Sequence, residues 1–145
     1  MTRLARWVRS PWDDKLLLAE IAALSLLFRG VMVWAPFATT QRLAARLAAR
    51  SRGSTGPRAR DAARVGWAAD GVGRTLPMVS CLSQALAAHV LLVRAGHEAE
   101  IKIGVTRGSD RRFVAHAWVE LDGNVIVGDH ELDRYVATSG PGRVA

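Results

Sequence analysis

A change of hydrophobic period near Gly96 constrains the fold of this sequence more than any other feature. Apolar residues recur at helical spacing across residues 81–95, and Gly96 is a typical helix terminator. Beyond it the spacing becomes two, and Ile101, Ile103 and Val105 alternate with Glu, Lys and Gly as in a half-buried strand. This switch predicts an α+β fold, in which helix 81–95 packs on a small antiparallel sheet.

The sheet is expected to continue as a hairpin. Residues 112–121 and 124–129 have the composition of strands, and Asp122-Gly123 between them is a strong signal for a two-residue turn. In that register His116 lies directly opposite Asp129, with Cβ atoms about 4.5–5.5 Å apart. The hairpin therefore predicts a His–Asp contact. A register shift of one residue would move Asp129 to the other face. The alternative carboxylates are then Asp122, Glu131 and Asp133.

Residues 13–35 predict a long, almost continuously apolar helix, which Pro36 ends. Its length suggests a membrane span, but Glu20 and Arg29 interrupt the apolar run, and a charge at mid-bilayer depth is costly. A buried or interfacial helix fits better, and we expect it to dock a partner protein.

Two shorter helices are expected next, over residues 39–50 and 58–74. Thr39 or Thr40 would cap the first, and Gly71 and Gly73 would end the second. Residues 51–57 between them are rich in Ser, Gly and Pro and read as a linker. We therefore divide the chain into an N-terminal helical region, 1–56, and a main unit, 57–145.

Cys81 is the only cysteine, which excludes an internal disulfide and any multi-cysteine metal site. The N-terminus carries no secretion-signal pattern, so we expect a cytoplasmic location. Ser80 is a suitable N-cap and would place Cys81 in the first helical turn, where the helix dipole favours a thiolate and a backbone N–H can donate to an oxyanion.

A lone cysteine is usually a small buried hydrophobe, and a strand histidine is usually structural. The coincidence of a thiol at a helix start, His116 in a strand and Asp129 opposite it instead favours a Cys–His–Asp hydrolase or acyltransferase. His89 lies on the apolar side of the cysteine helix and reads as a core residue.

The net charge of +7 belongs to the first half of the chain. Residues 1–75 carry 13 basic and 5 acidic residues, whereas residues 76–145 carry 7 and 8. Such a basic half leaves open a solvated helix face, an acidic peptide partner and peripheral contact with an anionic membrane. Basic residues do not interleave with aromatic ones as in nucleic-acid modules, so we expect no nucleic-acid partner.

Three runs carry a family resemblance: 81–87 (Cys-Leu-Ser-Gln-Ala-Leu-Ala), 103–105 (Ile-Gly-Val) and 115–120 (Ala-His-Ala-Trp-Val-Glu), with Asp122-Gly123 after the last. Together they resemble the B2-type leader peptidases of lasso-peptide biosynthesis. These proteins are similar to the C-terminal domain of the microcin-processing B protein and lie within the transglutaminase-like, papain-related cysteine protease superfamily. The resemblance covers roughly residues 60–136.

The resemblance implies a cysteine protease that removes the leader from a ribosomally made precursor peptide, without a cofactor or metal. Cys81 maps to the nucleophile, His116 to the general base and Asp129 to the carboxylate. The partners it implies are the precursor's leader, a separate leader-recognition protein acting in trans, and the ATP-dependent macrolactam cyclase. The N-terminal helix, 13–35, would dock the recognition protein or the cyclase. Acyl transfer to an amine and a non-catalytic scaffold are the alternatives.

Overall fold

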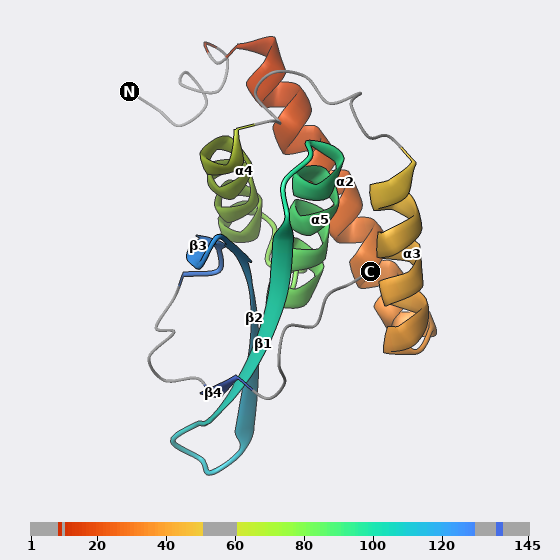
Figure 1. The fold of residues 1–145 in the computed structure, drawn as a ribbon. Coiled ribbons are helices and arrows are strands. Elements are labelled where there is room, and N and C mark those ends of the chain that lie inside the picture. The colour runs from red at the N-terminus through yellow and green to blue at the C-terminus, as the bar shows by residue number, and fades with distance from the viewer. Residues whose placement is uncertain (1–8, 10, 51–60, 130–135, 138–145) are drawn as a thin grey trace.

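The computed structural model describes residues 9, 11–50, 61–129 and 136–137, and within them four helices precede a four-stranded antiparallel sheet (Figure 1). The helices are α2 (Trp12–Trp34), α3 (Phe37–Ala49), α4 (Ala62–Thr75) and α5 (Cys81–Arg94). The strands are β1 (Ala99–Arg107), β2 (Phe113–Leu121), β3 (Asn124–Val127) and β4 (Val136–Ala137). The fold is α+β, with the cysteine-bearing helix packed on the sheet, as the sequence predicts.

Helix α5 is the centre of the core. It packs against α2, α3 and α4 and against strands β1 and β2. Every residue from Ala85 to Leu92 is buried, because neighbours surround this helix on all sides rather than along one stripe. At its far end, Arg94 donates from Nε to the Leu47 carbonyl at 2.8 Å and ties α5 to α3.

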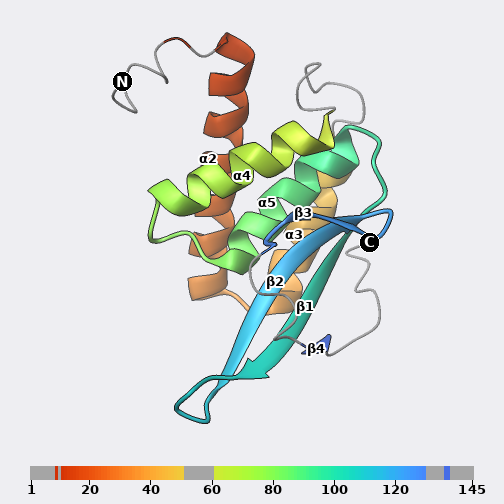
Figure 2. The ribbon, with the colours of Figure 1, turned by 90° about the vertical axis from the view of Figure 1, so that its left-hand side faces the viewer.

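The sheet has the strand order β3-β2-β1-β4. Strands β1 and β2 pair from Ala99↔Leu121 to Arg107↔Phe113, and the far half of this hairpin projects beyond the helices (Figures 1 and 2). The face of the sheet that contains Ile101, Ala117 and Val119 belongs to the buried core. The small apolar face of β2 therefore packs on the helices.

Two expectations about helix ends were wrong. Helix α3 begins at Phe37, directly after Pro36, so neither Thr39 nor Thr40 caps it, and Thr40 is buried inside the helix. Pro36 follows α2 and directly precedes α3. Proline has no backbone N–H to donate, and a residue at this position does not need to donate a hydrogen bond to either helix.

Helix α4 continues through Gly71 and Gly73 to Thr75 rather than ending at the glycines. A Cβ on Gly73 would lie 2.6 Å from Oε1 of Gln84, whose Nε2 donates to the Ala69 carbonyl at 2.7 Å. Gly73 therefore serves the packing of α4 against α5, not helix termination. The start of α4 is set by Asp61, which accepts a hydrogen bond from the Ala63 N–H. The linker at 51–57 and the domain boundary predicted there lie outside the described residues.

Candidate active site

Cys81 is the first residue of α5, and its thiol is free and half-buried. The helix start is fixed by a reciprocal pair of bonds between Ser80 and Ser83. Ser80 Oγ accepts from the Ser83 N–H at 3.2 Å, and Ser83 Oγ accepts from the Ser80 N–H at 3.0 Å. This capping box confirms Ser80 as the N-cap and holds Cys81 at the helix N-terminus, where backbone N–H groups lack partners within the helix.

His116 lies on β2, is half-buried, and places Nε2 2.7 Å from the carbonyl oxygen of Gly128. A carbonyl oxygen only accepts hydrogen bonds, so Nε2 carries the proton of the neutral ring and donates it. In a neutral ring of this tautomer, Nδ1 is the nitrogen that can act as a general base.

The register beside His116 differs from the expected one. Strands β2 and β3 pair as Leu121↔Asn124 and Glu120↔Val125, in agreement with the predicted turn, but the next pair is Val119↔Val127. Ile126 is the extra residue of a β-bulge. The bulge shifts the register by one residue, and β3 ends at Val127 instead of residue 129. The direct opposition of His116 and Asp129 is therefore not formed.

Instead of facing Asp129, His116 contacts the preceding residue, Gly128. The His116 ring reaches the carbonyl of Gly128, and Asp129 follows with an exposed side chain. Gly128 has φ +86°, and a Cβ there would lie 2.9 Å from the Ala117 carbonyl oxygen. Only glycine combines this conformation with so close an approach to β2. The structure thus brings His116 to the Gly128–Asp129 segment. The role of Asp129 as the triad carboxylate stays a prediction, and two alternatives, Glu131 and Asp133, lie outside the described residues.

A polar cluster extends from His116 along the same face of the sheet. The Trp118 ring stacks on the His116 ring, with centroids 6.1 Å apart and an interplanar angle of 23°. Trp118 Nε1 donates to Glu120 Oε1 at 2.8 Å, and Glu120 Oε2 lies 3.6 Å from Lys102 Nζ. Alternation along β2 places the histidine, the tryptophan and the glutamate on one face. Their mutual contacts, and the participation of Lys102, were not predicted.

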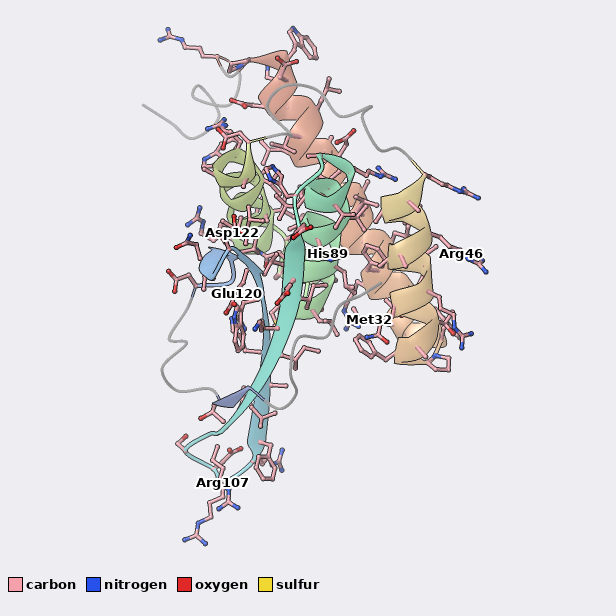
Figure 3. All side chains as sticks on the ribbon, in the orientation of Figure 1. Met32, Arg46, His89, Arg107, Glu120 and Asp122 are labelled. Carbon is pink, nitrogen blue, oxygen red and sulfur yellow. The ribbon has the colours of Figure 1, made fainter. Side chains whose placement is uncertain are left out.

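Successive side chains of a strand point to opposite faces, so His116, Trp118 and Glu120 project from the face opposite to Ala117 and Val119. Figure 3 shows Glu120 on the side of the sheet away from His89 of α5. Helix α5, with Cys81 in its first turn, packs against β2. Because α5 packs on the face of β2 that carries Ala117 and Val119, the structure places the His116 side chain on the face away from α5, and the catalytic pairing of thiol with imidazole stays a prediction.

The described residues contain no group of three or more His, Cys, Asp or Glu side chains that could hold a metal ion. A family model described as the transglutaminase-like superfamily matches residues 25–139, which include α3 to α5 and the whole sheet. No curated protein and no solved structure matches the chain. With the match extending over most of its length, and with a cysteine at a helix start and a histidine in the adjacent sheet, this chain belongs to the transglutaminase-like superfamily.

Proposed function

We propose that the chain is a cysteine peptidase that removes the leader from a ribosomally synthesised lasso-peptide precursor, with Cys81 as nucleophile, His116 as general base and Asp129 as the supporting carboxylate. The superfamily supplies the class of chemistry, thiol-dependent hydrolysis or acyl transfer. The resemblance of residues 81–87 and 115–120 to the B2-type leader peptidases supports the finer assignment.

The observation that carries the proposal is the hydrogen bond from His116 Nε2 to the Gly128 carbonyl. It fixes the ring plane and selects the tautomer in which Nδ1 accepts a proton. In this tautomer Nδ1 is the nitrogen that can act as the base.

In the proposed reaction, His116 Nδ1 takes the Cys81 proton, and the thiolate attacks the scissile carbonyl. The tetrahedral oxyanion accepts hydrogen bonds from backbone N–H groups at the start of α5, such as that of Cys81. The intermediate collapses as His116 protonates the departing amine of the core peptide, which leaves the leader as a thioester on Cys81. His116 then takes a proton from water, the resulting hydroxide cleaves the thioester, and the leader leaves with a free carboxylate.

The test is mass spectrometry of a leader-bearing precursor incubated with the chain, with and without a leader-recognition protein. We expect a free leader carboxylate from the wild type and intact precursor from Cys81→Ala. The matched control is Met78→Ala, at an exposed side chain three residues upstream, and it should cleave at the wild-type rate. Normal cleavage by Cys81→Ala would end the proposal.

Acyl transfer to an amine is the second candidate, because the superfamily assignment supports it equally. The same spectra separate the two: an amide adduct of the leader, in place of its carboxylate, indicates transfer. A non-catalytic scaffold predicts neither product. Since Cys81 is the only cysteine, a thiol reagent modifies one site, and rapid labelling at mildly acidic pH would argue against the scaffold.

A further inference from the structure

Helix α2 has an outward face that is apolar along its whole length. The inner face packs on the core through residues such as Leu17, Ile21 and Phe28. The exposed residues on the side away from that inner face are mostly apolar, and exposed Glu20 lies at the edge of this apolar stripe. This outer stripe consists of Trp12, Leu16, Ala19, Ala23, Leu26, Leu27, Gly30 and Trp34. Over 23 residues it is about 33 Å long, and Figure 2 shows α2 at the outer edge of the molecule.

The contacts of the inner face oppose insertion of α2 across a bilayer, although its length and its mean hydropathy of 2.0 would allow a span. Asp14 is almost fully buried, and its carboxylate lies 2.6 Å from the Arg64 guanidinium on α4. Moving α2 into a bilayer would break this ion pair and uncover the core residues of α4 and α5. These contacts favour a helix that lies along a surface and keeps its inner face on the core.

The chemistry of the stripe and its flank fits a lipid surface. Trp12 and Trp34, 78% and 90% exposed, stand at the two ends, and tryptophan is the side chain that prefers the boundary between headgroups and acyl chains. The sequence before the helix, residues 1–11, contains Arg3, Arg6 and Arg9 and no acidic residue. Cations beside an interfacial helix attract anionic headgroups.

We propose that α2 docks this protein peripherally on an anionic lipid bilayer, with the helix axis in the membrane plane and the outer stripe inserted at the headgroup boundary. Helix α5 lies between α2 and the sheet (Figure 2), so docking through the outer stripe leaves the sheet on the side away from the membrane. This docking is independent of the proposed peptidase activity.

The experiment is cosedimentation of the full chain with vesicles of phosphatidylcholine containing about 30 mol% phosphatidylglycerol, beside vesicles of phosphatidylcholine alone. We expect binding to the anionic vesicles that weakens with added salt, and at least roughly tenfold weaker binding by Leu27→Glu, which places a charge in the inserted stripe. The matched control is Phe113→Ala. It removes another exposed aromatic ring, 71% accessible, but from the hairpin, and it should bind as the wild type does.

Because Leu27 is exposed, Leu27→Glu should keep the wild-type thermal midpoint, which separates lost binding from lost folding. Wild-type protein that stays in the supernatant would overturn the proposal, as would equal losses by Leu27→Glu and Phe113→Ala. A dimer that Leu27→Glu converts to monomers, without vesicle binding, would assign the stripe to a second copy of the chain. Vesicle-independent binding to a recognition protein or cyclase, lost in the same variant, would assign it to that partner.

Discussion

The imidazole of His116 is anchored to the main chain of Gly128, with Nε2 2.7 Å from the carbonyl oxygen. In the proposed triad the carboxylate of Asp129 has two tasks, orienting the ring and stabilising its charged form. The Gly128 carbonyl already performs the first. The orientation of the base therefore depends on the backbone path after β3 as much as on any acidic side chain.

We predict that Asp129→Asn lowers the rate of leader removal less than His116→Ala does. The asparagine variant keeps the carbonyl that holds the ring and loses only the negative charge, whereas alanine at position 116 removes the base itself. Cleavage rates measured by mass spectrometry under single-turnover conditions check the order. Wild-type rates for Asp129→Asn would transfer the carboxylate role to another acid, with Glu131 and Asp133 the next variants to make.

Gly128→Ala should damage the site far more than Gly123→Ala. Both glycines have positive φ, +86° and +79°, so both substitutions carry a backbone cost of roughly 1 kcal/mol. Only at Gly128 would the new Cβ meet neighbouring atoms, at 2.9 Å from the Ala117 carbonyl oxygen. We expect Gly123→Ala to keep at least half the cleavage rate and Gly128→Ala to lose it by tenfold or more, with both proteins folded by circular dichroism. Equal losses would mean that the close approach does not matter to the site.

The ion pair between Asp14 and Arg64 should respond unequally to removal of its two partners. The Asp14 side chain is 7% exposed and that of Arg64 29%. Arg64→Met removes the guanidinium beside a buried carboxylate and should cost about 3 kcal/mol of unfolding free energy, whereas Asp14→Asn leaves a partly hydrated guanidinium and should cost about 1–2 kcal/mol. Urea unfolding measures both. The double variant should lose less than the two single losses together, and strict additivity would show that the two groups are not coupled.

Because the His89 imidazole is buried, we predict that the protein loses stability on acidification. Burial lowers the pKa of His89 below its usual value of 6.5, and the Ala99 carbonyl, which accepts from Nε2 at 3.1 Å, only partly opposes this. Above pH 6.5 the ring is neutral in both folded and unfolded chains. Below it, the unfolded chain takes up a proton that the folded chain resists, so stability falls at up to about 1.4 kcal/mol per pH unit.

Urea unfolding between about pH 7.5 and pH 5 tests this, with His89→Gln compared with the wild type. The glutamine at position 89 should remove much of the slope between the two pH values, although it also lowers stability at neutral pH by disturbing the core. An unchanged slope in His89→Gln would assign the acid sensitivity to another group.

The parts of the fold that were predicted correctly are determined by residues close together in the sequence. Ser80 and Gly96 bracket α5, which spans Cys81–Arg94 against the predicted 81–95, and the Asp122-Gly123 turn has the positive φ angles that a two-residue hairpin requires. Each of these features is decided by residues a few positions apart. The resemblance of residues 81–87 and 115–120 likewise located the superfamily without any coordinates.

The errors arise where distant parts of the chain meet. Gly73 could be read as a helix end because its packing partner, Gln84, lies in the next helix. The bulge at Ile126 left no sign in the hairpin sequence, and it displaced the expected opposition of His116 and Asp129. The pairing of β4 with β1 joins segments about thirty residues apart and has no local signal either. The sequence shows that the outer stripe of α2 is apolar, but its exposure depends on which face of α2 packs against the core.

Gly66 extends the candidate site to a residue fifty positions upstream of the histidine. A Cβ at this position in α4 would lie 2.4 Å from the carbonyl oxygen of Ile126, the bulged residue whose strand leads to Gly128. The backbone of α4 at Gly66 therefore packs directly against the end of β3 and determines its position. Transferring the β2–β3 hairpin to another scaffold would keep every residue of the motif. The Gly128 carbonyl that holds His116 would still be misplaced, unless the new scaffold had a helix with a glycine at the position of Gly66.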